Sequence, residues 1–145
     1  MFNSRGYYLT NWSNTSSGLF FDLGGITVDG TGHAYVASLF ENIIWKSDSQ
    51  GNLLSRPSSP GSGNGQSAFP FGVAVDPVGN VYVADFGNHR IQKFDFSGNF
   101  LGAFGGSGVG NGTFGYPACV TVNQSNGQVV VTDISNNLIE QFSSS

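Results

Sequence analysis

The sequence has few charged residues, and very few of them are basic. Only 10% of its 145 residues are Asp, Glu, Lys or Arg, and the formal net charge is −4. A protein that neutralises nucleic-acid phosphates needs a concentrated basic surface. The five basic residues are instead scattered, at Arg5, Lys46, Arg56, Arg90 and Lys93. This pattern disfavours RNA binding, and we expect no nucleic-acid partner.

Cysteine and long apolar runs are also scarce. The single Cys119 forms no internal disulfide, and its setting in "PACVTV" predicts a buried, inert thiol on a strand. No apolar run reaches the roughly 20 residues of a membrane-spanning helix, so we expect no membrane span. The first ten residues, "MFNSRGYYLT", lack the apolar core of a signal peptide.

Motifs for catalysis or for metal binding are missing as well. The sequence has no nucleophile elbow, CxxC pair, HExxH or phosphate loop. Its two histidines, His33 and His89, fall at different positions of the pattern described below, whereas a catalytic zinc usually takes three protein ligands. Acidic residues at strand ends are typical of turns that accept backbone N–H groups; these are Asp29, Asp76, Asp85 and Asp133. We therefore expect no metal, no cofactor and no enzymatic activity.

Glycine and aromatic residues are abundant, and they follow a repeat. There are 22 Gly and 13 Phe, and "GGITVDGTGHAYVASLFENIIWKSDSQGN", "FGVAVDPVGNVYVADFGNHRIQKFDFSGN" and "ACVTVNQSNGQVVVTDISNNLIEQF" align with one another. Val28, Val75 and Val122 are equivalent in this alignment. Units of this length with short strand-forming runs and intervening turns predict propeller blades. The fold class is therefore all-β, with four-stranded antiparallel blades.

The second unit, "FGVAVDPVGNVYVADFGNHRIQKFDFSGN", resembles a bacterial-type NHL repeat. The resemblance implies a six-bladed β-propeller used mainly as a binding platform. The Asp, Asn and Arg of the family's blade correspond to Asp85, Asn88 and Arg90, which we interpret as a structural turn lock. The third unit keeps Asp133 and Asn136 but has Leu138 in place of the arginine.

Three blades are too few to close a ring. We divide the chain into a first blade over 13–57, a second over 58–106 and an incomplete third over 107–145, which stops before a fourth strand. Residues 6–12, "GYYLTNW", are a spare strand. The spare strand of one copy can complete the third blade of another copy by donor-strand addition. We expect the pairing to use Tyr7, Tyr8, Leu9 and Trp12 of the donor strand and Ile139 and Phe142 of the third blade. The product is a closed ring of two copies or a filament. The alternative is that residues 1–17 are a disordered extension of a fragment.

Low charge and four N-glycosylation tripeptides favour an extracellular or cell-surface location. The acceptor residues are Asn11, Asn14, Asn111 and Asn123, although such tripeptides also arise by chance in Ser- and Asn-rich sequence. We expect a non-enzymatic module that assembles with itself and binds a protein or carbohydrate ligand. The alternative is a propeller enzyme with a lyase-like metal site formed between chains.

Overall fold

The computed structural model describes residues 4–8, 11–12 and 22–143, and in these ranges the regular secondary structure is almost entirely β. The helical structure in these ranges is a single 3-10 turn, η1 (Phe86–Asn88). No helix among the described residues is long and apolar enough to span a membrane. The strands are β1 (Leu23–Val28), β2 (Ala34–Ser38), β3 (Ile43–Ser47), β4 (Leu53–Ser55), β5 (Ser59–Pro60), β6 (Gln66–Ser67), β7 (Pro70–Val75), β8 (Val81–Asp85), β9 (Arg90–Phe94), β10 (Phe100–Gly105), β11 (Pro117–Val122), β12 (Val129–Asp133) and β13 (Leu138–Phe142).

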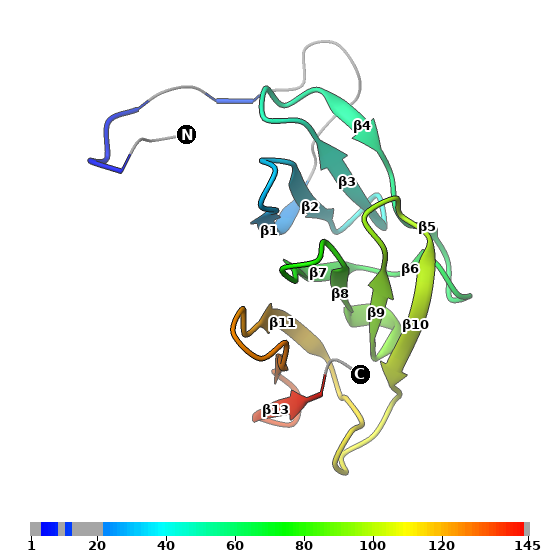
Figure 1. Ribbon diagram of the computed structural model, residues 1–145. Helices are drawn as coiled ribbons and strands as arrows, with labels where there is room; N and C mark the ends of the chain where they lie inside the picture. The colour runs from blue at the N-terminus through cyan, green and yellow to red at the C-terminus, as the bar shows by residue number, and fades with distance from the viewer. Residues whose placement is uncertain (1–3, 9–10, 13–21, 144–145) are drawn as a thin grey trace.

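Apart from the short parallel pair β5–β6, the strands form three antiparallel sheets that follow one another like propeller blades (Figure 1). Blade 1 has the order β1-β2-β3-β4, blade 2 has β7-β8-β9-β10, and blade 3 has β11-β12-β13. The strands β1, β7 and β11 lie along one side of the stack, and β4 and β10 lie along the other. The all-β propeller fold predicted from the repeat is confirmed, and in the described residues blade 3 has three strands.

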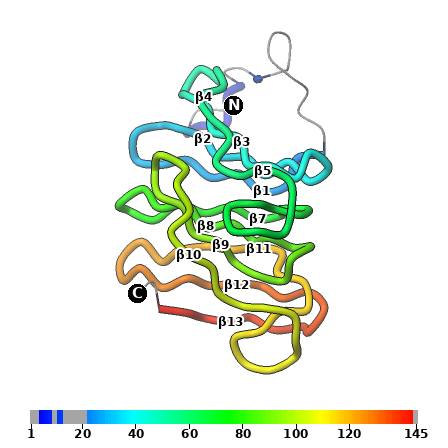
Figure 2. Tube along the Cα trace, turned by 90° about the vertical axis from the view of Figure 1, so that its right-hand side faces the viewer, coloured from blue at the N-terminus to red at the C-terminus, as the bar shows by residue number. Residues whose placement is uncertain are grey.

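The core lies between the blades, which stack face to face in Figure 2. Between blades 1 and 2, the buried side chains are Tyr35, Ala37, Ile44, Val73, Val75, Val81, Val83 and Phe94. Between blades 2 and 3, they are Ala74, Tyr82, Ala84, Ile91, Phe114, Val120, Val122, Val129 and Val131. Both faces of blade 2 are therefore apolar, because each packs against a neighbouring blade.

The innermost strands of neighbouring blades, β1, β7 and β11, approach one another closely enough to require glycine. A Cβ on Gly72 of β7 would lie 2.5 Å from the carbonyl oxygen of Ala118 and 3.0 Å from the Cα of Cys119 on β11. A Cβ on Gly25 of β1 would lie 3.2 Å from the Cα of Gly72. Within the chain, a side chain at this position would therefore collide with the backbone of the next blade.

Two sequence-based interpretations differ from the structure. Cys119 lies on a strand as expected, but it is exposed, so the predicted buried thiol is wrong. Val120 and Val122 point into the core toward blade 2, and alternation along β11 turns Cys119 away from it. The short parallel pair β5–β6, inside the connector between blades 1 and 2, was not expected, because its residues show no apolar alternation.

Candidate functional site

The predicted turn lock is an assembled group of side chains at one end of blade 2. The carboxylate of Asp85 is fully buried and accepts hydrogen bonds from Arg90 Nε at 2.8 Å and from Asn88 Nδ2 at 2.9 Å. It also accepts from Ala68 N at 2.8 Å and from Gln92 Nε2 at 3.0 Å. The structure thus brings Asp85, Asn88 and Arg90 together and adds the buried Gln92, which sequence reasoning missed.

The lock also holds the connector that enters blade 2. Arg90 Nη2 donates to the carbonyl oxygens of Gly63 at 2.7 Å and Gln66 at 2.8 Å. Asn88 Nδ2 donates to the carbonyl of Gly61 at 2.9 Å. These contacts engage the polar groups of the lock in holding the η1 loop and the connector in place.

The other two blades carry variants of the same device. In blade 3, Asp133 accepts from the backbone N–H groups of Gly115 at 2.7 Å and Tyr116 at 2.9 Å, and from Asn136 Nδ2 at 2.8 Å. In blade 1, Ser38 replaces the aspartate and donates to Glu41 Oε2 at 2.8 Å. Trp45 Nε1 donates to the same oxygen at 2.9 Å, so a glutamate supplies the missing carboxylate.

Close in sequence to the lock residues, five aromatic side chains form two contact groups, Phe40 with Phe69 and Phe71 with Phe86 and Tyr116, which we together call the aromatic strip. Its members are Phe40, Phe69, Phe71, Phe86 and Tyr116. The rings of Phe86 and Tyr116 stack at 4.6 Å between centroids, and Phe40 meets Phe69 edge-on at 6.2 Å. Four of the five rings are exposed, all except that of Phe86. Sequence reasoning missed this strip, although Phe69 and Tyr116 occupy equivalent connector positions.

Phe69 is held in an unusual backbone conformation. Its φ of 47° lies in the left-handed region, which a bulky residue rarely adopts. Asn42 Oδ1, from the turn of blade 1, accepts a hydrogen bond from Phe69 N at 2.6 Å. This contact joins the first two blades directly beside the strip.

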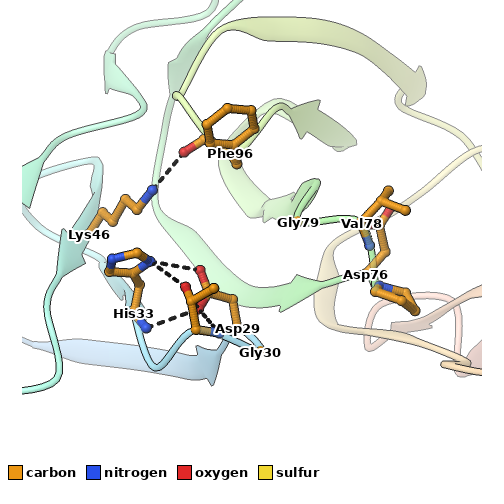
Figure 3. A pocket seen from close by; sticks show the side chains of 10 residues that line it. Asp29, Gly30, His33, Lys46, Asp76, Val78, Gly79 and Phe96 are labelled. Carbon is orange, nitrogen blue, oxygen red and sulfur yellow. Dashed lines mark hydrogen bonds and ion pairs between the residues drawn. The ribbon is translucent and has the colours of Figure 1, made fainter.

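At the opposite end of the blades, a hollow of about 300 Å³ lies between the turns of blades 1 and 2 (Figure 3). Asp29 and Asp76 line it, but each carboxylate already serves its own turn: Asp29 accepts from Thr31 Oγ1 at 2.7 Å and Asp76 from Asn80 N at 2.8 Å. Lys46 Nζ donates to the carbonyl of Phe96 at 2.6 Å and closes one side. The hollow is a weaker candidate than the strip because these polar groups are engaged.

The two histidines lie at opposite ends of the blades. His33 is in the turn between β1 and β2, where Nδ1 lies 3.1 Å from Asp29 Oδ2. His89 follows η1, where its Nδ1 contacts the carbonyl of Gly115 and its ring packs on Tyr116. They do not share a site, and among the described residues no group of three or more His, Cys, Asp or Glu is placed to hold a metal ion.

At both ends of the blade stack, a blade face is exposed although the equivalent faces of the other blades are buried. Ile44 and Ile91 are each 0% exposed, whereas the equivalent Ile139 of blade 3 is 75% exposed. Val75 and Val122 are 7% and 5% exposed, whereas the equivalent Val28 of blade 1 is 57% exposed. We call these surfaces the blade 3 open face (Cys119, Thr121, Val130, Thr132, Ile139) and the blade 1 open face (Ile26, Val28).

The outer part of blade 1 is already covered on the same side. Val36, Ile43 and Trp45 form a small buried cluster, and the Arg56 guanidinium lies 4.5 Å from the centroid of the Trp45 ring. The blade 1 open face is therefore confined to the inner strand.

The described residues of the predicted donor segment, 6–8 and 11–12, lie clear of blade 3 in their own chain (Figure 1). Tyr7 and Tyr8 are exposed, and the ring of Trp12 packs on Gly51, where a Cβ would lie 2.5 Å from Trp12 Cγ. Leu9 and Asn14 fall outside the described residues. The other glycosylation candidates, Asn11, Asn111 and Asn123, are exposed. On β13, which lies at the end of the third sheet, Phe142 packs partly into the core.

The carboxylates in the turns make the stability of the fold depend on pH. Burial raises the pKa of Asp133, but hydrogen bonds from the backbone N–H groups of Tyr116 and Gly115 more than offset this and leave the pKa lowered. Burial also opposes the shift at Asp29, where hydrogen bonds from Thr31 and His33 lower the pKa.

We expect the thermal unfolding midpoint to fall as the pH drops below about 4, the ordinary range of an aspartate. A lowered pKa in the folded state means that the unfolded state binds protons more readily, so stability is present above that pH and is lost in acid. Calorimetry over a pH series measures this. Asp133→Asn should flatten the dependence, and an unchanged slope in that variant would contradict the assignment.

Comparison with known proteins places these features in a family. The family model described as "NHL repeat" matches residues 68–94 and 114–142, which contain β7 to β9 and all three strands of blade 3. The chain carries NHL repeats. No curated protein sequence is significantly similar to it. The matched segments contain the Asp85 and Asp133 locks, so the NHL repeats coincide with the turns that support the aromatic strip.

Solved structures share the fold at low sequence identity. A catalytically inactive virginiamycin B lyase from Staphylococcus aureus with quinupristin has a TM-score of 0.64 and 17% identity, covering 98% of this NHL-repeat chain and 47% of the lyase. An auxiliary nutrient binding protein from Bacteroides thetaiotaomicron has a TM-score of 0.63 and 16% identity, covering 80% and 36%. Hydrazine synthase of Kuenenia stuttgartiensis has a TM-score of 0.60 and 11% identity, covering 84% and 33%. The chain therefore spans between a third and a half of each of these chains.

Proposed function

We propose that this NHL-repeat chain is a non-enzymatic binding module that joins a second copy of itself through its two open faces. The observation that carries the proposal is the exposure of Ile139, against the complete burial of Ile44 and Ile91 at equivalent positions. Each buried side chain of this kind contributes roughly 1.5–3 kcal/mol. Two copies supply six blades, and the product is a closed ring or a filament.

The spare strand strengthens the junction. Residues 6–12 of one copy add to the outer edge of β13 in the other, beside Ile139 and Phe142, with Tyr7 and Tyr8 covering the edge. Backbone pairing of this kind supplies main-chain hydrogen bonds, which an open strand edge otherwise offers to any passing chain.

Deleting residues 1–16 tests the proposal. The full chain should elute as a species of at least twice the 15.3 kDa of one copy, and the deletion variant as single copies or nonspecific aggregates. Size-exclusion chromatography with light scattering measures both masses. A deletion variant with the same assembly as the full chain would show that the strand exchange is wrong.

The aromatic strip is the surface that we propose for the ligand. The exposed aromatic rings and the low charge of the chain favour a ligand with an uncharged binding surface, either a protein or a carbohydrate. The exposure of Asn11, Asn111 and Asn123 accords with an extracellular or cell-surface location, in which these residues carry glycans. Mass spectrometry of the protein purified from its natural source tests the glycans.

An enzyme is the alternative, favoured by the similarity in fold to a virginiamycin B lyase. Its site would form only where two chains meet. Metal analysis of the purified assembly separates the two proposals, because a stoichiometric zinc would favour the enzyme.

A further inference from the structure

The innermost strands of the three blades, β1, β7 and β11, carry Gly25, Gly72 and Cys119 at positions that are equivalent in the repeat. Gly25 and Gly72 each face the blade that follows. At Gly72 the next inner strand leaves no room for a Cβ, and at Gly25 a Cβ would lie in tight contact, 3.2 Å from the Cα of Gly72. Blade 3 carries a cysteine instead, and its side chain is exposed on the blade 3 open face.

We propose that Cys119 sets the spacing of the junction between copies, keeping it wider at the inner strand than the two junctions within the chain. This inference rests on the proposed function, and its occupant is blade 1 of a second copy. In the internal geometry, the backbone facing Gly72 is that of residues 118–120. In the junction, the equivalent backbone is that of residues 24–26 in the second copy, which occupies the same space.

The extra atoms of Cys119 therefore meet a backbone and not a yielding side chain. At Gly72, a Cβ alone would come within 2.5 Å of a carbonyl oxygen, and a cysteine adds a sulfur beyond that Cβ. Backbone in a sheet yields less than the end of a flexible side chain, so the second copy is displaced outward. The outer parts of the two faces, with Ile139 on one side, stay in contact, and the junction is looser than the internal ones.

The cysteine is also a direct probe of the junction, because it is the only one in the chain. We expect a maleimide to label Cys119 quickly in dilute, single copies and at least about tenfold more slowly in the assembly, because burial limits access to a thiol. Equal labelling rates in the two states would overturn the placement of Cys119 in the junction.

Cys119→Gly tests the spacing. Removing the side chain should lower the dissociation constant of the assembly by about tenfold or more, since overpacking of this kind is costly. Cys119→Ser, which keeps the size of the side chain, should assemble like the natural chain and is the control. Sedimentation at several concentrations measures the constants, and thermal unfolding of the dilute variants shows whether each still folds.

The outcomes separate the two proposals. If the natural chain assembles and Cys119→Gly has the same or a weaker constant, the spacing inference is overturned and the proposed function stands. If the natural chain stays single at every concentration, the proposed function is overturned and the inference falls with it.

Discussion

Ile139→Asp is expected to abolish assembly while leaving the single chain folded. In one copy Ile139 is 75% exposed, so the substitution leaves the core of the chain untouched. In the junction, the carboxylate would be buried without a partner, which costs about 3 kcal/mol or more and raises the dissociation constant at least about 100-fold. Light scattering measures the mass, and circular dichroism verifies the fold.

The control for this variant is Val78→Asp. Val78 is also an exposed apolar side chain, but it lies in the turn between β7 and β8 of blade 2, which belongs to neither open face. It should assemble as the natural chain does. If both variants assemble normally, blade 3 is not the junction.

Asp85→Ala is expected to destabilise the chain by about 3–5 kcal/mol, since it removes the carboxylate of a buried ion pair and leaves the Arg90 guanidinium without its counter-charge. Arg90, Asn88, Gln92 and the N–H of Ala68 all lose Asp85 as an acceptor at once. Chemical denaturation measures the loss.

Asp95→Ala is the matched control. Asp95 also accepts hydrogen bonds within a turn, from Ser97 N and Asn99 N, but that turn is exposed to water. Its loss should cost far less than the loss of Asp85, because water replaces the hydrogen bonds of an exposed turn. Similar losses for the two variants would show that the lock adds nothing beyond a common turn.

The fold was predictable because the repeat is written in residues that the blades share. The equivalence of Val28, Val75 and Val122 predicted successive blades, and the structure places these valines at equivalent positions on β1, β7 and β11. Side chains that contact their own turn, such as Asp85 and Asn88, were predictable for the same reason. Their partners lie a few residues away, so local pattern suffices.

Features that depend on packing between blades were not predictable from one repeat at a time. Gln92 reads as an exposed strand residue, yet it is buried, because the connector with β5 and β6 folds over it. Cys119 reads as a core residue within "PACVTV", and its exposure follows only from which side of β11 the next blade would cover. The aromatic strip combines residues of turns, connectors and β7 from different blades, so no single stretch reveals it.

Sedimentation equilibrium of the purified full chain over a wide range of concentration tests the central claim most directly. If the two open faces join a second copy, the mass should rise with concentration from 15.3 kDa to at least twice that value. A mass that stays at 15.3 kDa at every concentration would show that the open faces are not joined by a second copy and would contradict the account.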